Sequence, residues 1–244
     1  MGLSVIVHNS NSPPYNLALD EVLLDSVSRG FREGVFRVWI NSESIVIGAG
    51  LDVCEEVYCE EALRLRVPIY RRISGGGAVY HDLGNINASI VMRSEAPTVD
   101  QVYRFGLGFL ASVLRRVGVV VHVENVNDLV VNGFKVSGSS AYIKPNAFLF
   151  HATLLVKSNI SRLRRLIKPR LDRVRRGEVT PAKYNPGNLS WFIDVDTDYM
   201  VRVLVDYALG FFNNASRGGL MEWEVEKAID LARNKYKDLL HGIA

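Results

Sequence analysis

The chain has 244 residues, and its 29 Lys and Arg residues against 26 Asp and Glu residues give a formal net charge of +3. This charge is too small to indicate a nucleic-acid-binding protein by itself. Apolar residues make up 48% of the chain, but no run of them approaches the roughly eighteen residues of a membrane span. Residues 1–9 lack the pattern of a secretory leader. We therefore expect a cytoplasmic globular protein with no membrane partner, in which Cys54 and Cys59 are reduced packing residues.

The apolar pattern predicts strands and helices in the following order. A strand at 3–8 precedes a helix that has Asn16 as its N-cap and ends at Gly30. Residues 36–40 and 44–48 are predicted to pair as two strands. The remaining predicted elements are helices at 55–66, 99–117, 199–212 and 222–240 and strands at 67–70, 85–92, 119–123, 128–131 and 147–156, with a further strand from residue 134 onward. This order indicates one α+β domain over residues 1–244, with a mixed or antiparallel central sheet flanked by helices.

The most informative stretch is Arg71-Arg72-Ile73-Ser74-Gly75-Gly76-Gly77-Ala78-Val79-Tyr80-His81-Asp82, which joins two predicted strands. Glycines have no Cβ atom, so a ligand can lie directly against the peptide N–H groups. The two arginines and the histidine add further donors, a combination that suits an anionic ligand such as a phosphate. The alternative is a hairpin whose glycines serve only the turn. A second glycine segment, Gly48-Ala49-Gly50, starts like a dinucleotide fingerprint but has Val53 in place of the third glycine.

A second informative stretch follows at residues 127–141. Asn132-Gly133 predicts a two-residue hairpin turn. Because side chains alternate along a strand, Lys135 and Ser137 are predicted to share one face, where the small residues after Ser137 leave room for a ligand. An exposed strand lysine is the alternative. His151 and Thr153 share a face of the next strand, and His151 is either a hydrogen-bonded core residue or part of the same site.

Basic residues crowd the segment 162–176. They are Arg162, Arg164, Arg165, Lys168, Arg170, Arg173, Arg175 and Arg176, with Asp172 as the only acid among them. Such a run is usually a solvated face or a mobile loop. It also suits the docking of an acidic partner or a nucleic acid.

Both informative stretches resemble the signatures of the lipoate–protein ligase family. The first extends through Leu83-Gly84-Asn85, and the second reads Asn127-Asp128-Leu129-Val130-Val131-Asn132-Gly133 followed by Lys135-Val136-Ser137-Gly138-Ser139. Tyr15-Asn16-Leu17-Ala18-Leu19-Asp20-Glu21 is similar to the family's N-terminal helix, and His151-Ala152-Thr153-Leu154-Leu155 to a later strand. The matches are collinear from about residue 13 to residue 156, and two long motifs in the right order are very specific.

The resemblance implies a catalytic domain of the class II synthetase and biotin-ligase type. It implies that ATP, with Mg²⁺, and lipoate give lipoyl-AMP, and that the lipoyl group then passes to a lysine of an acceptor lipoyl domain. The acceptor would be a 2-oxoacid dehydrogenase E2 protein or the glycine cleavage H protein. Many members carry a small C-terminal accessory domain, which is absent from residues 1–244, so the resemblance implies either a separate accessory protein or an enzyme that works without one.

The resemblance also assigns roles to residues. Lys135 would be catalytic, bridging the lipoate carboxylate and the α-phosphate of ATP, and Asp128 would hold Mg²⁺. The expected ATP and lipoyl-AMP site comprises Arg72, Ser74, Gly75, Gly76, Gly77, Ala78, Val79, Tyr80, His81, Asn127, Asp128, Lys135, Ser137, Gly138 and Ala141. The expected lipoate pocket comprises Trp39, Val46, Gly48, His151 and Thr153.

Three other functions compete with this interpretation. An octanoyltransferase of the same superfamily acts without ATP through a thioester on cysteine, which some relatives carry just before the Asn-Asp strand. This chain has Val121-His122-Val123-Glu124-Asn125 there, and no other residue type supplies a thiol. A biotin ligase is disfavoured because the Ser-Gly-Gly-Gly-Ala turn resembles the lipoate version. Nucleic-acid binding through residues 162–176 is disfavoured because the segment lacks interleaved aromatic residues and any nucleic-acid module.

Overall fold

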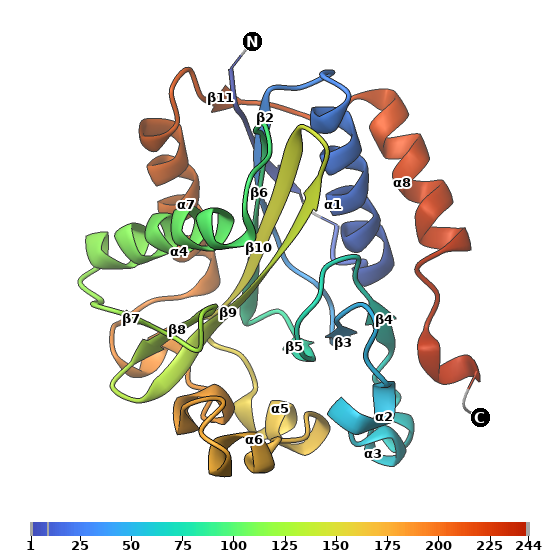
Figure 1. The fold of residues 1–244 in the computed structure, drawn as a ribbon, viewed down its shortest axis with the longest axis vertical. Helices are drawn as coiled ribbons and strands as arrows, with labels where there is room; N and C mark the ends of the chain where they lie inside the picture. The colour runs from blue at the N-terminus through green and yellow to red at the C-terminus, as the bar shows by residue number, and fades with distance from the viewer. Residues whose placement is uncertain (1, 9, 243–244) are drawn as a thin grey trace.

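The computed structural model describes residues 2–8 and 10–242 and has two β-sheets at its centre, with helices around them (Figure 1). The helices are α1 (Pro13–Ser28), α2 (Val53–Glu56), α3 (Cys59–Arg64), α4 (Val99–Arg116), α5 (Ile160–Leu166), α6 (Leu171–Arg175), α7 (Thr197–Phe211) and α8 (Glu222–Asn234). Three short 3-10 helices are η1 (Pro181–Tyr184), η2 (Leu189–Trp191) and η3 (Leu239–Gly242). The strands are β1 (Ser4–His8), β2 (Gly34–Trp39), β3 (Ser44–Ile47), β4 (Ile69–Arg71), β5 (Val79–His81), β6 (Asn85–Arg93), β7 (His122–Glu124), β8 (Asp128–Val131), β9 (Phe134–Lys144), β10 (Ala147–Leu155) and β11 (Ser216–Arg217).

The large sheet has eight strands in the order β11-β1-β2-β6-β10-β9-β8-β7. β1 runs parallel to β2 and β11, and every other neighbouring pair in this sheet is antiparallel. The small sheet has the order β4-β3-β5, with β3 parallel to β4 and antiparallel to β5. The prediction of an α+β fold with a mixed sheet flanked by helices is therefore confirmed.

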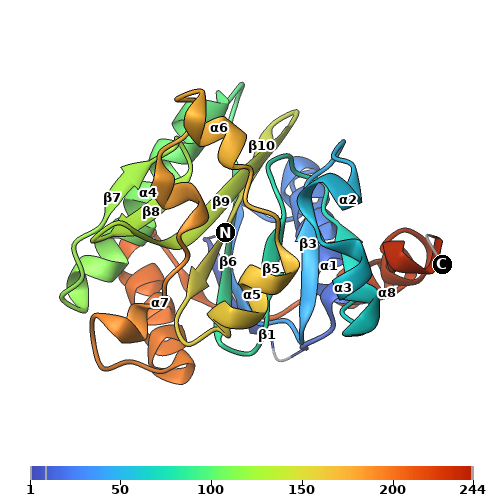
Figure 2. The same cartoon turned by 90° about the horizontal axis from the view of Figure 1, so that it is seen from below.

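Helices cover both faces of the large sheet. α4 and α7 lie on one face, where Phe36 of β2 and Phe109 of α4 are buried in a shared apolar cluster. α1 lies on the other face, and α8 packs on the outer side of α1 (Figures 1 and 2). α4 starts at a capping box, because Thr98 Oγ1 accepts from the Gln101 N–H and Gln101 Oε1 accepts from the Thr98 N–H. None of the described helices is long and apolar enough to cross a membrane.

The strand register places four polar residues in one row across the large sheet. Arg37 of β2 lies opposite Ser89 of β6, and Ser89 lies opposite His151 of β10. His151 in turn lies opposite Ser140 of β9. Directly opposite side chains project from the same face of a sheet. The row therefore lies on a single face, and hydrogen bonds to Asp20 of α1 identify it as the face that α1 covers.

Several predicted elements differ from the structure. The strand predicted at 119–123 is β7 at 122–124, and the helix predicted at 222–240 ends at Asn234. Residues 36–40 and 44–48 do not pair, because β2 lies between β1 and β6 in the large sheet while β3 belongs to the small sheet. The single helix predicted at 55–66 is broken into α2 and α3. At the break the backbone is extended: Val57 bridges to Ile167, and the Tyr58 N–H donates to the Leu166 carbonyl.

The first helix also begins earlier than predicted. It starts at Pro13, with Ser12 as its N-cap, because proline suits the first helical turn. Asn16 is therefore not a cap but a fully buried residue inside the helix. Asp20, one turn further along the helix, is also buried.

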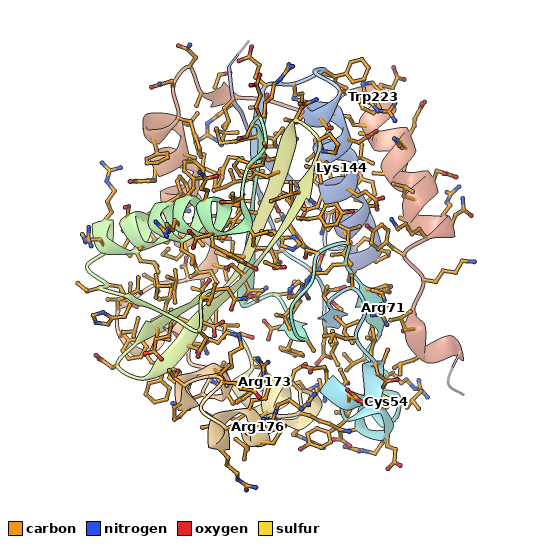
Figure 3. The ribbon with its side chains drawn as sticks, viewed as in Figure 1. Cys54, Arg71, Lys144, Arg173, Arg176 and Trp223 are labelled. Atoms are coloured by element: carbon orange, nitrogen blue, oxygen red, sulfur yellow. A yellow bond between two sulfur atoms is a disulfide. The ribbon has the colours of Figure 1, made fainter. Side chains whose placement is uncertain are left out.

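The expectation of two reduced cysteines was wrong. Cys54 and Cys59 form a disulfide, and both are only half-buried rather than packed in the interior. The break between α2 and α3 brings their Cα atoms to 5.5 Å, within the range that a disulfide bridges. Figure 3 labels Cys54 in this corner of the molecule. No cysteine is free in the described part of the chain.

Candidate active site

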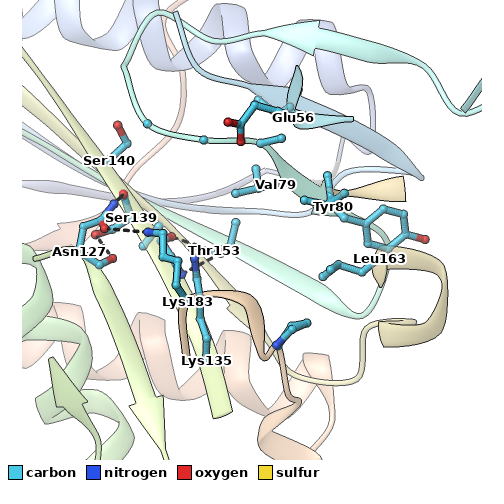
Figure 4. Close-up of a pocket in the computed structure, with 18 of the residues that line it drawn as sticks. Glu56, Val79, Tyr80, Asn127, Lys135, Ser139, Ser140, Thr153, Leu163 and Lys183 are labelled. Carbon is cyan, nitrogen blue, oxygen red and sulfur yellow. Dashed lines mark hydrogen bonds between the residues drawn. The ribbon is translucent and has the colours of Figure 1, made fainter. Parts of the chain in front are cut away.

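A cavity of about 770 Å³ is lined by residues of both sheets and of the segment that leads from α5 to η1. Figure 4 shows part of its lining, with Val79 of β5 across the space from Lys135 and Lys183. The charged lining residues are Arg72, Lys135, Arg164, Lys168, Arg173 and Lys183 against Glu56 and Glu178. This excess of cations suits an anionic ligand, and the volume is ordinary for a small-molecule site.

Most of the predicted site residues meet in this cavity. Those that line it are Trp39, Val46, Arg72, Gly76, Gly77, Ala78, Val79, Tyr80, His81, Asn127, Lys135, Gly138, His151 and Thr153. Six others do not line it, namely Gly48, Ser74, Gly75, Asp128, Ser137 and Ala141. Ser74, Gly75 and Asp128 contact lining residues, whereas Ala141 packs against the apolar cluster under α4 and α7. What each residue binds stays a prediction.

Arg72 stabilises the glycine-rich turn through hydrogen bonds from its side chain. Its guanidinium donates to the carbonyl oxygens of Gly75 at 2.6 Å, Gly77 at 2.9 Å and Val46 at 3.1 Å. Ser140 Oγ also donates to the Gly75 carbonyl, at 2.9 Å. Burial lowers the pKa of Arg72 to about 10, so the side chain stays cationic at neutral pH. The resemblance implied that Arg72 holds phosphates directly. In the structure the Arg72 guanidinium fixes the shape of the turn and adds a positive charge next to it.

Gly48 serves this turn rather than the wall of the cavity. A Cβ atom at Gly48 would lie 2.0 Å from the Gly76 carbonyl oxygen, so only glycine lets β3 end directly beneath the turn. The Ala49 N–H then donates to the Ser74 carbonyl at 2.9 Å. The predicted role of Gly48 in the lipoate pocket therefore has no support from its position.

A buried polar cluster lies behind the apolar end of the cavity, and we call it the Asp20 cluster. Its members are Asn16, Asp20, Arg37, Ser89 and His151. The Asp20 carboxylate accepts from Arg37 Nη1 at 2.9 Å and from Ser89 Oγ at 2.9 Å, and it lies 3.0 Å from His151 Nδ1. Arg37 Nη2 also donates to Asn16 Oδ1. Because Arg37 is fully buried and paired with Asp20, the two charges balance inside the protein.

The Asp20 cluster holds two side chains of the cavity wall. The Trp39 indole N–H donates to Ser89 Oγ at 2.9 Å, and the Arg37 guanidinium lies over the Trp39 ring at 4.9 Å from its centre. His151 Nε2 lies 2.6 Å from Ser74 Oγ, which accepts from Arg72 Nε at 3.1 Å. These bonds link the glycine-rich turn to α1 and fix the end of the cavity that Leu17, Trp39 and Val46 make apolar.

His81 offers a neutral polar group to the cavity. Asn41 Nδ2 donates to His81 Nδ1 at 2.9 Å, which places the ring proton on Nε2. Burial, with Arg72 and His151 nearby, lowers the pKa of His81 to about 3, so the ring is neutral at physiological pH. His81 Nε2 is buried and has no hydrogen-bond partner within the described residues. A ligand group that accepts a hydrogen bond would satisfy it.

At the opposite end of the cavity one buried carboxylate holds two lysines, and we call Asp128, Lys135 and Lys183 the Asp128 cluster. Asp128 is fully buried at the start of β8. Its Oδ1 lies 2.8 Å from Lys135 Nζ, and its Oδ2 lies 3.0 Å from Lys183 Nζ. Lys183 Nζ also donates to Asn127 Oδ1 at 3.2 Å. Both lysine side chains are about one-fifth exposed and line the cavity, side by side in Figure 4.

The predicted face of Ser137 was wrong. The β8–β9 pairing shifts register between Leu129 and Val130, with Lys135 opposite Val130 and Ser137 opposite Leu129. A β-bulge of this kind interrupts the alternation of side chains that the prediction assumed. Lys135 consequently lines the cavity, whereas Ser137 is fully buried outside it and its hydroxyl has no partner within the described residues.

The residues present do not fit Mg²⁺ at Asp128. Both carboxylate oxygens already accept from ammonium groups, and a divalent cation placed there would lie against Lys135 and Lys183. The described residues contain no group of three acidic, histidine or cysteine side chains arranged for a metal. Asp128 is therefore suited to hold the two lysines and not a metal ion.

The arginine-rich segment forms one wall of the cavity and is largely paired with acids that are distant in sequence. Arg162 lies 2.6 Å from Glu43, Arg165 pairs with Glu61, and Arg170 lies 3.4 Å from Glu56. Arg164, Lys168 and Arg173 line the cavity. Arg173 and Arg176, labelled at the bottom of Figure 3, both pair with Glu178. Only part of the charge that the sequence suggested is therefore available to a partner.

Several residues of the site were not identified from the sequence. Arg37 is the most visible of them, because it is a charged residue inside an otherwise apolar strand. Asn16 and Asp20 had a weaker signal, their spacing of four along a helix that carries leucines on the same side. Lys183 had none, because it lies in a segment of residues 180–189 that reads as a loop.

Comparison with known proteins defines the class to which this fold and cavity belong. The family model described as "Lipoyl protein ligase A/B catalytic domain" matches residues 12–208. The match covers more than half of the chain, so the chain belongs to this family. A protein of Aeropyrum pernix described as "Putative lipoate-protein ligase A" is 42% identical over 238 residues, which are 95% of this chain and 89% of that protein.

Solved structures share the fold. A chain from the structural analysis of a bi-partite lipoate protein ligase and its E2 lipoyl domain from Thermoplasma acidophilum is 25% identical, with a TM-score of 0.81 over 96% of this chain and 92% of that chain. A lipoate-protein ligase A bound with ATP is 24% identical and has a TM-score of 0.82 over 96% and 94% of the two chains. The chain spans only 57% and 55% of the matched lipoate-protein ligases of Mycoplasma pneumoniae and Bacillus subtilis.

Proposed function

We propose that this chain is an ATP-dependent lipoate–protein ligase. In the first step a lipoate carboxylate oxygen attacks the α-phosphorus of ATP, the bond from that phosphorus to the α,β-bridging oxygen breaks, and pyrophosphate leaves with the electron pair. In the second step the neutral amine of an acceptor lysine attacks the lipoyl carbonyl carbon, the bond to AMP breaks, and the amine loses a proton as the amide forms.

The observation that carries this proposal is that one cavity joins an apolar end to a cationic end. Leu17, Trp39 and Val46 suit an acyl chain at one end, and Lys135 with Lys183 suits a carboxylate and a phosphate at the other. Bringing two anions together requires fixed positive charge that is in place before the reaction. Lys135, on a strand and tied to Asp128 at 2.8 Å, is positioned for this role in both steps.

The octanoyltransferase alternative requires a cysteine that can carry an acyl group. Cys54 and Cys59 are joined in a disulfide, and the described residues contain no free thiol. A disulfide sulfur is not a nucleophile. The nucleotide-dependent route is therefore the better supported of the two.

The acceptor in this proposal is a lipoyl domain, either of a 2-oxoacid dehydrogenase E2 protein or of the glycine cleavage H protein. The resemblance to the bi-partite ligase of Thermoplasma acidophilum supports a lipoyl domain as acceptor and a second polypeptide that assists residues 1–244, the catalytic domain. Mg²⁺ would enter with the phosphates of ATP rather than through Asp128. The cytoplasm is the proposed location, because the reaction consumes ATP.

The test is the intact mass of an isolated acceptor lipoyl domain after incubation with this chain, ATP, Mg²⁺ and lipoate. The expected result is a mass increase equal to a lipoyl group in amide linkage, which disappears when ATP is omitted. A parallel reaction contains a candidate accessory protein. Modification without ATP from a lipoyl or octanoyl thioester donor would contradict the proposal and favour the octanoyltransferase.

A further inference from the structure

Lys183 is a second lysine at the same carboxylate as Lys135, and the two steps described so far give it no role separate from that of Lys135. Its Nζ atom lies 3.0 Å from Asp128 Oδ2 and 3.2 Å from Asn127 Oδ1. It comes from η1, which follows the arginine-rich segment, whereas Lys135 comes from β9. Two separate parts of the chain therefore bring an ammonium group to one point of the cavity wall.

The charges of the Asp128 cluster do not balance. One buried carboxylate faces two ammonium groups, which leaves one positive charge in excess at a place with little access to water. Burial and the neighbouring Lys135 both lower the pKa of Lys183, so this second charge is held at a cost. An anion that enters the cavity between the two lysines would relieve that cost.

Gly138 allows Lys135 to lie close to Asp128. A Cβ atom at Gly138 would lie 3.0 Å from both Cε and Nζ of Lys135, so glycine at this position lets the lysine fold back over the strand toward Asp128. When Lys135 turns from Asp128 to an incoming carboxylate, Lys183 stays bonded to Asp128. The buried carboxylate is then not left without a counter-ion.

We propose that Lys183 is a second cation of the adenylation step, and that Asp128 anchors Lys135 and Lys183 rather than binding a metal. This inference rests on the proposed function. As the lipoate oxygen bonds to the α-phosphorus and pyrophosphate leaves, the carboxylate and the triphosphate share a small volume. Lys135 balances the carboxylate and α-phosphate, and Lys183 balances the departing pyrophosphate. In the transfer step pyrophosphate is gone, and Lys135 alone suffices.

The experiment compares Lys183→Gln, Lys183→Arg and Lys135→Ala in the two partial reactions. Pyrophosphate release is measured with ATP, Mg²⁺ and lipoate, and transfer is measured from synthetic lipoyl-AMP to an isolated lipoyl domain. Glutamine keeps hydrogen-bond donors for Asp128 and Asn127 but removes the charge, whereas arginine keeps the charge. Lys237→Ala, an exposed lysine that does not line the cavity, is the control for the loss of one positive charge elsewhere.

We expect Lys183→Gln to slow adenylation about 100-fold and transfer less than about tenfold, with an unchanged melting temperature. Lys183→Arg should recover adenylation to within about tenfold of the wild type, and Lys135→Ala should lose both steps. Near-normal adenylation in Lys183→Gln would overturn the inference, because hydrogen bonding would then suffice. Equal losses in both steps would also overturn it, because Lys183 would then act only by holding Lys135. Absence of lipoyl-AMP formation by the wild type, both alone and with the candidate accessory protein, would instead contradict the proposed function.

Discussion

The two ends of the cavity each contain a buried carboxylate, and the charges around the two carboxylates differ. Asp20 faces one fully buried guanidinium, that of Arg37, together with hydrogen bonds from uncharged groups. Asp128 faces two ammonium groups that are partly open to the cavity. The Asp20 cluster is balanced and closed, which suits the positioning of Trp39 and His151. The Asp128 cluster has one positive charge in excess, which suits the binding of an anion.

The largest expected effect is on the free energy of unfolding, which should differ between variants of the Asp20 cluster and of the Asp128 cluster. Arg37→Gln leaves Asp20 buried without its counter-ion, and losing one partner of a buried pair costs about 3–5 kcal/mol of unfolding free energy. Lys183→Gln should cost less than about 1 kcal/mol, because Lys135 still pairs with Asp128. Urea denaturation of both variants measures the difference. Similar losses of unfolding free energy in the two variants would contradict the view that only the Asp20 cluster depends on a single buried ion pair.

The next effect is on rate. Lys135→Ala should slow both pyrophosphate release and lipoyl transfer by about a hundredfold or more, which corresponds to about 2.7 kcal/mol of transition-state stabilisation. The fold should survive, because Lys183 still pairs with Asp128. Rates of both steps and thermal unfolding are measured on the same preparation. Near-normal rates in both steps would show that Lys135 is not a catalytic residue.

A smaller effect is expected for the disulfide, which lies outside both clusters. Replacing Cys54 and Cys59 by serine opens a loop of about six residues, for which chain entropy gives a loss of about 2 kcal/mol. Acyl transfer should stay intact, since neither sulfur takes part. The same loss should appear when the unmodified protein is unfolded with a reductant present. An acyl group trapped on either sulfur would restore the octanoyltransferase alternative.

The smallest effect concerns the arginine-rich segment. The arginine-rich segment forms one wall of the cavity that an acceptor must approach, so the exposed residues Arg165 and Arg175 would attract an acidic acceptor. Reversing both to Glu should raise the acceptor KM a few-fold, with lipoyl-AMP formation unchanged, and Arg104→Glu on α4 is the matched control. The rate at low acceptor should fall with salt, because surface charges are screened over roughly 10 Å at 0.1 M. If neither the charge reversal nor the salt concentration changes the acceptor KM, the segment is a solvated face that does not bind the acceptor.

The sequence predicted best those parts of the site that are continuous along the chain. The glycine-rich turn and Lys135 lie in motifs, and each motif brings its own backbone geometry with it. Asp20 and Arg37 could not be assigned, because their pairing depends on α1 covering one face of the large sheet. The face of Ser137 was predicted wrongly because the β-bulge between β8 and β9 cannot be recognised from the pattern of side chains.

The same limit applies to the fold. Most strand positions followed from the apolar pattern, but β5 and β11 were not predicted, and β7 begins three residues later than the strand predicted at 119–123. The pairing of β2 and β3 was also wrong, since these neighbours in sequence belong to different sheets. The break between α2 and α3 arises from backbone hydrogen bonds to residues 166–168, more than a hundred positions away. The disulfide follows from that break. Each of these features depends on contacts between distant parts of the chain.

The most direct test of the contrast is lipoate-dependent exchange of pyrophosphate into ATP, measured for Asp128→Asn and Ser89→Ala. Asp128→Asn frees both lysines from their anchor and should lower kcat at least about tenfold, with the KM for lipoate within about threefold of the wild type. Ser89→Ala leaves the Trp39 N–H without its partner and should raise the KM for lipoate about tenfold, with little change in kcat. The reverse assignment, with Ser89→Ala acting on kcat and Asp128→Asn on the lipoate KM, would contradict the division of the cavity into a positioning end and a reacting end.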